Sequence, residues 1–365
     1  MPRVQRIAQY ASIDHEMLSQ KQGMDAGVTF DQRYFVRCTG LGNWSGSDVI
    51  DTVHRVRGEL GSPHLSYLPA LPDRGYAAST LARSIAVLDG LEADGASFGW
   101  RLVSGYSREA EKARSLFTSD LNALADTVGK ESASGNALKL QFCGPFTLAS
   151  SLHLPQGERA IADYGAVRDI RDAFIAGLGS WLKLVREAVP DEQIIIQFDE
   201  PDLGAAMAGQ ISTASGLRTY RAIKPEILES SYELLAQEMK NHNVFTAVAN
   251  APHPYLASLQ STVNASAFSS KNFEERDWEK VATLIEAGQQ VWLGVADTHQ
   301  VQSVSSLAHS LWKSWRTVGL SADQLSGLTL TERGDLSEIS SPQATAVLRH
   351  LTETARAVSE IAQDQ

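Results

Sequence analysis

Two adjacent acids, Asp199 and Glu200, form the pattern in this sequence that most strongly indicates chemistry. They follow an apolar segment and precede Pro201. Two carboxylates at the end of a buried strand can have different roles, because one can hold a cation while the other stays hydrogen-bonded to the protein. The alternative interpretation is an exposed acid pair at the capped start of a helix. We expect Asp199 and Glu200 to bind substrate.

Asp297 and His299 are a second candidate pair, separated by one residue. In an extended segment, side chains two positions apart point to the same side, so the carboxylate can orient or acidify the imidazole. A histidine on a surface loop is the alternative. We predict a catalytic role for both residues.

A glycine-containing turn, Gly40-Leu41-Gly42-Asn43, follows the first predicted strand. Its backbone N–H groups can bind a carboxylate or a phosphate, although many such turns are only turns. Two further polar clusters, at residues 143–147 and 331–334, also follow predicted strands. In a parallel barrel these strand ends meet at one face, where active sites lie.

Short apolar segments alternate with amphipathic ones from about residue 34 to the end of the chain, which is typical of βα units. Seven strands are predicted at residues 34–39, 138–142, 193–198, 244–248, 263–268, 290–295 and 328–331, and an eighth between residues 99 and 105. Helices with apolar residues every three or four positions are predicted around residues 110–124, 170–185 and 347–361.

Eight strands with helices between them favour a (βα)8 TIM barrel over a doubly wound sheet, and no G-x-G-x-x-G opens a helix after the first strand. We expect an N-terminal extension at residues 1–30 and a single barrel domain at residues 31–365. The proline-containing segment 60–78 is interpreted as a long ordered loop, and Trp312 and Trp315 as core residues of a helix.

Charge and cysteine content limit the partners and the compartment. The 365 residues include 32 Lys and Arg and 43 Asp and Glu, a net charge of −11 without any basic cluster, which argues against nucleic-acid and membrane partners. Cys38 and Cys143 lie far apart and form no metal-binding or disulfide pattern. With no signal-like or membrane-spanning segment, the sequence predicts a cytoplasmic protein with a small-molecule substrate.

Six segments resemble one known family when they are taken in order: TGLGNWSG, SPHLSYLPALPDRG, GWRL, CGPFTLA, QFDEP and LGVADTH. They are similar to the catalytic barrel of cobalamin-independent methionine synthase, most closely to its short single-barrel bacterial relatives, from about Cys38 to the C-terminus. The resemblance implies a barrel of the methionine-synthase and uroporphyrinogen-decarboxylase type. It also implies S-methyl transfer from a methylated tetrahydropterin to homocysteine or a similar thiol, a step of methionine biosynthesis.

The resemblance also implies roles for individual residues. Leu41, Gly42 and Asn43 occupy the turn that binds the homocysteine carboxylate in the family. Asp199 matches the aspartate that contacts the substrate amine, and His299 matches the histidine regarded as the proton donor to the pterin.

The zinc ligands of the family are not matched. Thr246 and Val248 stand where the family has His-x-Cys, Arg333 stands where it has a cysteine, and residues 263–272 contain no acid. These side chains cannot bind zinc as thiolates or imidazoles do, so we expect a degenerate zinc site, no metal ligand and no other cofactor.

Two functions therefore remain open. One is an S-methyltransferase that lowers the pKa of its thiol substrate without zinc, from an ordinary value of about 8.5. The alternative is a divergent member of the family that binds a small amino acid or carboxylate without the family reaction. A structural barrel without a ligand is a third possibility, against which Asp199 and His299 argue.

Overall fold

The computed structural model describes residues 35–131, 137–251, 253–300 and 302–364. The predicted extension at residues 1–30 lies outside this part of the chain. Eight strands form one parallel sheet in the order β1-β11-β10-β9-β8-β7-β5-β2. Their bounds are β1 Arg37–Cys38, β2 Ser66–Tyr67, β5 Ala137–Cys143, β7 Gln193–Asp199, β8 Phe245–Ala249, β9 Ala265–Ser269, β10 Gln290–Asp297 and β11 Leu328–Arg333.

Backbone hydrogen bonds join the two end strands of this sheet. Leu65 N–H donates to the carbonyl of Cys38, and Ala70 N–H donates to the carbonyl of Gly42, both at 2.9 Å. The sheet thus curls on itself, and the prediction of a TIM-barrel α/β fold is confirmed.

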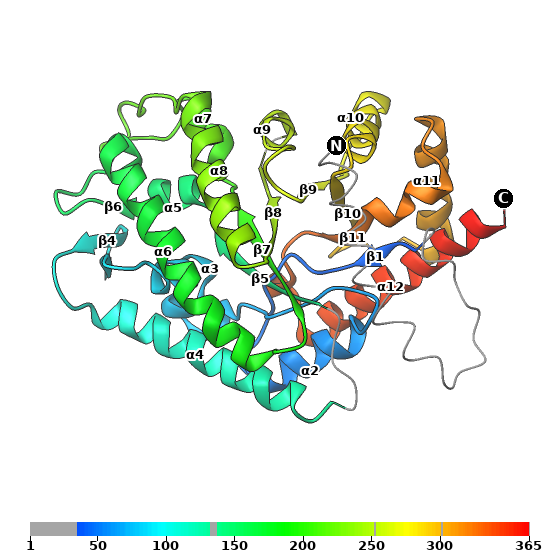
Figure 1. The fold of residues 1–365 in the computed structure, drawn as a ribbon, viewed down its shortest axis with the longest axis horizontal. Coiled ribbons are helices and arrows are strands. Elements are labelled where there is room, and N and C mark those ends of the chain that lie inside the picture. Colours follow the sequence, from blue (N-terminus) through cyan, green and yellow to red (C-terminus); the bar gives the residue numbers. More distant parts are fainter. Residues whose placement is uncertain (1–34, 132–136, 252, 301, 365) are drawn as a thin grey trace.

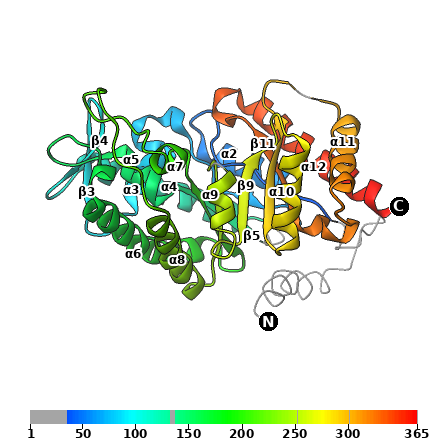
Figure 2. The same ribbon diagram turned by 90° about the horizontal axis from the view of Figure 1, so that it is seen from above.

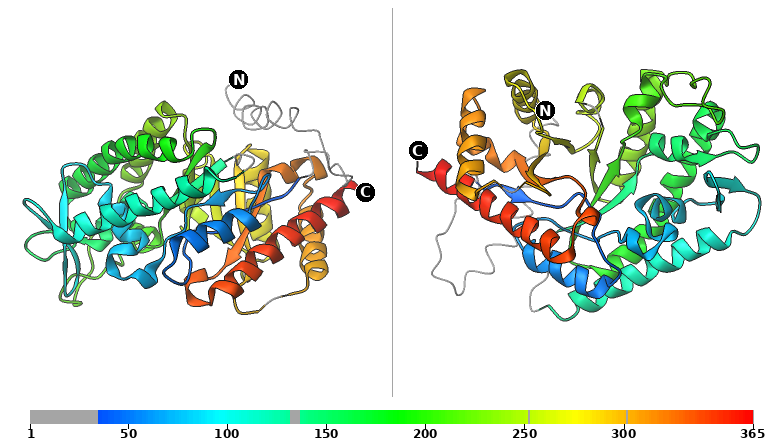
Figure 3. Two further views of the ribbon diagram at one scale, coloured as in Figure 1. Left: turned by 90° about the horizontal axis from the view of Figure 1, so that it is seen from below. Right: turned by 180° about the vertical axis from the view of Figure 1, so that it is seen from behind.

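Helices cover the outer side of the sheet (Figure 1). The C-terminal helix α12 lies beside α2, the first helix of the described residues, and α2 lies beside α4, so the outer layer also closes between early and late helices (Figure 3). Their bounds are α2 Val49–Glu59, α3 Thr80–Ala86, α4 Arg108–Val128, α5 Pro145–Ser151, α6 Tyr164–Ala188, α7 Leu203–Met207, α8 Pro225–Asn241, α9 His253–Ser258, α10 Glu275–Glu286, α11 Val304–Thr317 and α12 Ser341–Gln363.

The prediction that the strand at residues 99–105 belongs to the barrel is wrong. The segment 99–105 does form a strand, β4 (Gly99–Val103), but β4 pairs with β3 (Glu92–Ala96) and β6 (Leu152–His153) in a separate sheet. This small sheet lies at the end of the molecule opposite β11 (Figure 2). The eighth barrel strand is β2, inside the predicted loop 60–78. β2 has only two residues and lies between Pro63 and Pro69. It is too short to show the alternation of apolar and polar residues by which strands are recognised.

Side chains at alternate positions of the barrel strands belong to two apolar regions, one outside and one inside the sheet. Ile194, Ile196 and Val248 pack outward against the helices. A small inner cluster consists of Leu65, Ile195, Ala247, Ala249, Ala265, Ala267 and Trp292. Trp312 and Trp315 are 7% and 1% exposed, which confirms them as core residues. No helix in the described ranges is long and apolar enough to cross a membrane.

Candidate functional site

A cavity of about 290 Å³ lies at the carboxyl ends of the barrel strands. Three predicted site residues line it, namely Leu41, Asn43 and Asp199. The other polar side chains that line it are Asn250, Ser269, Thr331, Glu332, Arg333 and Asp335. The cavity therefore carries three acids and one arginine at the face where barrel proteins bind ligands.

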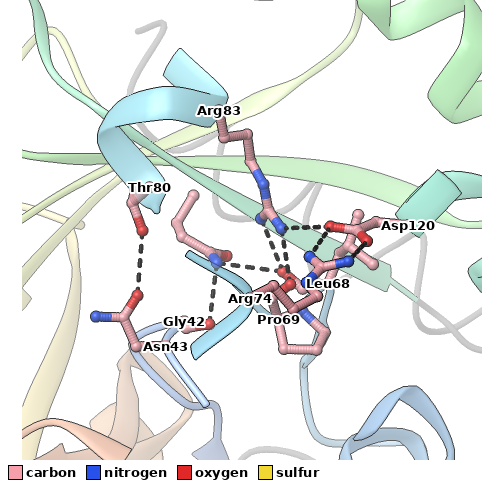
Figure 4. A network of polar contacts seen from close by, with 9 residues as sticks. Gly42, Asn43, Leu68, Pro69, Arg74, Thr80, Arg83 and Asp120 are labelled. Atoms are coloured by element: carbon pink, nitrogen blue, oxygen red, sulfur yellow. Dashed lines mark hydrogen bonds and ion pairs between the residues drawn. The ribbon is translucent and has the colours of Figure 1, made fainter. Parts of the chain in front are cut away.

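The turn after β1 is held in place by side chains from other strands and loops (Figure 4). Gly42 has φ 135°, and a Cβ atom there would lie 2.4 Å from the Gln141 side chain, so only glycine fits. Gln141 Nε2 donates to the Gly42 carbonyl at 3.0 Å. Asn43 Nδ2 donates to Asp335 at 2.8 Å, and Asn43 Oδ1 accepts from Thr80 at 3.1 Å. Both ends of the Asn43 amide thus contact protein groups.

A buried ion cluster fixes the loop that packs under this turn (Figure 4). Arg74 donates to both oxygens of Asp120, at 2.6 and 2.8 Å. Arg83 donates to Asp120 at 3.3 Å and to the carbonyls of Leu68 and Pro69 at 3.2 and 2.7 Å. One carboxylate on α4 therefore holds two guanidinium groups that tie the loop to the barrel.

The backbone of Leu41 joins the turn to the cavity acids. Its N–H donates to Glu332 Oε1 at 2.6 Å. Its carbonyl accepts from Gln197 Nε2 at 2.8 Å and from Lys139 Nζ at 3.4 Å. The N–H group that the sequence suggested for a ligand is thus bonded to Glu332.

Asp199 faces the cavity with one oxygen engaged. Its Oδ1 accepts from Gln197 Nε2 at 2.7 Å and from Asn250 Nδ2 at 3.3 Å. Within the described residues, Oδ2 accepts no hydrogen bond. Burial raises the pKa of Asp199 to about 6, against the lowering effect of the Gln197 amide and the Lys139 cation.

Glu200 is placed differently from its neighbour. It is fully buried and does not line the cavity. Its Oε1 accepts from Phe146 N–H at 3.1 Å and from the Tyr232 hydroxyl at 3.0 Å. Its Oε2 accepts from Thr147 N–H at 2.8 Å and from the Thr147 hydroxyl at 2.7 Å. Glu200 thus anchors the start of α5, and the structure does not bring it to the ligand site expected from the sequence.

Asp297 and His299 do not form the carboxylate–imidazole pair expected from their spacing. Asp297 Oδ1 accepts from the backbone N–H groups of His299 and Gln300, at 2.9 and 3.0 Å, and Oδ2 accepts from Arg333 at 3.3 Å. These donors lower the pKa of Asp297. His299 is exposed, and neither residue lines the cavity. Their catalytic role stays a prediction.

Sequence reasoning named Glu332 only as part of the cluster after the last strand, and it named Arg333 there and at the place of a family zinc ligand. Both line the cavity. Glu332 is 1% exposed, and burial raises its pKa to about 7. Glu332 Oε2 and Arg333 Nε are buried atoms without a hydrogen-bond partner among the described residues. Each of these two cavity-lining residues thus has a buried polar atom that no group in the described part of the chain satisfies.

The donor atoms around the cavity do not fit the zinc of the resembled family. No group of three His, Cys, Asp or Glu side chains in the described residues is placed to hold a metal. Thr246 bonds Asn264, and Val248 packs in the outer core. Cys38 and Cys143 are both buried, and burial raises the pKa of each thiol, which disfavours thiolates.

Comparison with known proteins identifies the fold. No family model matches the sequence, and no curated protein matches it. Among solved structures, a B12-independent methionine synthase from Shewanella sp. W3-18-1 in complex with selenomethionine has a TM-score of 0.61 at 14% identity, over 91% of this chain and 100% of the other. A methyltransferase from Methanosarcina mazei has a TM-score of 0.54 at 12% identity, over 87% and 94%. This chain has the same barrel fold.

Proposed function

We propose, from the barrel fold that this chain shares with a methionine synthase and a methyltransferase, that it is a methionine-synthase-like protein that binds a small α-amino acid. The open donor and acceptor at Glu332 and Arg333 carry this proposal. A free amino acid has an ammonium group that donates and a carboxylate that accepts. Buried polar atoms without partners are costly, so a ligand that satisfies both is favoured.

The cavity offers a place for each charged group. Glu332 Oε2 and Asp199 Oδ2 can accept from the ammonium, and Arg333 Nε can donate to the carboxylate. A volume of about 290 Å³ is at the small end of ligand pockets. The methionine synthase of the same fold holds selenomethionine, an amino acid of this size class. The free, buried thiols of Cys38 and Cys143 are in keeping with the proposed cytoplasmic location.

A binding experiment with matched ligands tests the proposal. We expect L-methionine or L-homocysteine to raise the melting temperature and to bind in calorimetry. N-acetyl-L-methionine lacks the ammonium group and 3-(methylthio)propylamine lacks the carboxylate, so each should bind at least tenfold more weakly, the loss of about 1.4 kcal/mol. Equal binding of methionine and its N-acetyl derivative would overturn the assignment of the acids. Failure of every amino acid to bind would overturn the function.

S-methyl transfer to a thiol amino acid is the second candidate, favoured by the full-length fold shared with the methionine synthase. The substrate thiol must lose its proton before sulfur can attack a methyl group. Glu332 is the base that the cavity offers, because its pKa of about 7 lies within about two units of an ordinary thiol. Formation of methionine from homocysteine and a methylated tetrahydropterin would support this reaction, and binding without turnover would exclude it.

A further inference from the structure

A lysine is enclosed inside the barrel beneath the cavity. Lys139 on β5 has no exposed surface. Its Nζ donates to Gln197 Oε1 at 2.7 Å and to the Leu41 carbonyl at 3.4 Å. The ammonium also lies 5.0 Å from the ring centre of Tyr67 and 5.9 Å from that of Trp292. An apolar side chain would suit these aromatic surroundings at lower desolvation cost, so packing alone does not account for a lysine here.

The lysine determines which way the Gln197 amide points. A lysine ammonium only donates, so the oxygen of the amide must face Lys139. The NH2 group then points the other way, where Nε2 donates to Asp199 Oδ1 at 2.7 Å and to the Leu41 carbonyl at 2.8 Å. If the amide turned over, its oxygen would face the Asp199 carboxylate and repel it.

The charges around the lysine point to the same pair of acids. Asp199 and Glu332 favour the protonated form of Lys139, whereas burial and the Arg83 guanidinium oppose it. Burial is the larger effect, and it lowers the pKa of Lys139 to about 8. The lysine thus supplies a positive charge beneath two carboxylates that line the cavity.

We propose that Lys139 is a positioning residue that, through the Gln197 amide, holds the Asp199 carboxylate charged and directed into the cavity. It does not contact the ligand itself. The inference rests on the proposed function only where it assigns Asp199 to the ligand, since the arrangement of Lys139, Gln197 and Asp199 belongs to the free protein.

The test titrates the Asp199 carboxyl carbon by NMR without any ligand. The protein is labelled with carboxyl-13C aspartate, and the Asp199 signal is assigned by its loss in Asp199→Asn. In Lys139→Met, the titration midpoint of Asp199 should rise by at least about one pH unit, because an opposite charge and an aligned donor are lost. Lys112→Met on the exposed face of α4 should leave the midpoint unchanged.

The outcomes separate this inference from the proposed function. An unchanged Asp199 midpoint in folded Lys139→Met would overturn the positioning role, whether or not the wild-type protein binds amino acids. If Lys139→Met does not fold, Lys139→Gln takes its place. It keeps a donor and loses the charge, so the Asp199 midpoint should still rise through the loss of the charge alone. Failure of amino acids to bind, with a midpoint that rises, would overturn only the function.

Discussion

Asp199 and Glu200 are neighbours in sequence with opposite surroundings. Asp199 ends β7 on the interior side and reaches the cavity, whereas Glu200 points into the outer layer and accepts four hydrogen bonds. Alternation along an extended segment causes this division, because successive side chains lie on opposite faces. The sequence suggested that the two acids have different roles. It could not show which acid faces the ligand, since that depends on where the strand ends.

Arg333 is the residue whose replacement tests recognition of a ligand carboxylate. In Arg333→Met, affinity for L-methionine should fall by about ten- to hundredfold, the loss of one charge-assisted hydrogen bond. Affinity for 3-(methylthio)propylamine, which has no carboxylate, should stay the same. Calorimetry measures both, with the exposed Arg276→Met as the control. An equal loss for both ligands would instead indicate damage to the fold of the site.

Glu332 links the pH dependence of stability to that of binding. In the folded protein burial raises its pKa from 4.5 to about 7, so the folded state binds this proton more tightly than the unfolded state. The contribution of Glu332 to stability is therefore present below pH 4.5 and is lost as the pH rises to about 7. Ligand binding should show the opposite trend, because the ammonium needs the charged carboxylate.

Glu332→Gln separates these effects. The variant should have a free energy of unfolding that exceeds the wild-type value by about 1–3 kcal/mol at pH 8 and matches it near pH 4. It should also bind L-methionine at least about tenfold more weakly at pH 8. Urea unfolding at the two pH values measures the first effect, with the exposed Glu338→Gln as the control. If the free energies of unfolding of variant and wild type differed by the same amount at both pH values, the raised pKa of Glu332 would be refuted.

The elements that carry the site depend on one loop between β2 and α3. This loop packs under the turn at Gly42 and is tied to α4 by the Arg74–Asp120–Arg83 cluster. The strand that sequence analysis missed, β2, leads directly into this loop. Longer strands such as β5 and β7 were predicted to within one residue at each end, because segments of five or six mostly apolar residues are recognisable. A strand of only two residues, stabilised by partners that are distant in sequence, is not recognisable in this way.

Asp120→Asn tests the ion cluster at the element scale. It leaves two guanidinium groups, one of them fully enclosed, without a compensating carboxylate. We expect a loss of about 3–5 kcal/mol in the free energy of unfolding, because removing one partner of a buried ion pair leaves the other charge buried and uncompensated. Asp126→Asn, on the exposed side of the same helix, should change stability by less than about 0.5 kcal/mol. Similar values for the two variants in urea unfolding would contradict this account.

Gly42→Ala tests the close approach of the turn to Gln141. A Cβ atom would lie 2.4 Å from the Gln141 side chain, at a backbone φ of 135°. Gly46→Ala is a matched control, since it has φ 94° but its Cβ would meet no atom within 4 Å. Both variants carry backbone strain, and only Gly42→Ala adds a steric clash. Its free energy of unfolding should fall by about 1–3 kcal/mol more than that of Gly46→Ala, measured by urea unfolding. If both variants lost the same free energy of unfolding, the steric clash with Gln141 would not contribute to stability.

At the scale of the whole molecule, the barrel brings together residues that are nearly 300 positions apart. Leu41 N–H donates to Glu332, and Asn43 donates to Asp335. Sequence analysis placed these segments at the same face because the carboxyl ends of parallel strands meet. The fold class and the face on which the candidate cavity lies were therefore predictable. The bond of Leu41 to Glu332 and the enclosed Lys139 were not, since both depend on side-chain partners that lie far away in the sequence.

The distribution of side chains around the barrel face leads to a last prediction, on metal. The ends of β8 and β9 contribute small side chains, such as Ala249 and Ala267, while the acids come from β7 and β11. Among the described residues, no three His, Cys, Asp or Glu side chains are grouped to hold a zinc ion on this face. Affinity for L-methionine should therefore be the same, within about twofold, before and after exhaustive dialysis against a chelator, as measured by calorimetry with elemental analysis of both samples. If the protein held stoichiometric zinc and its removal abolished binding, the amino-acid site described above would be refuted. Binding would then depend on a metal and not on Glu332 and Arg333 alone.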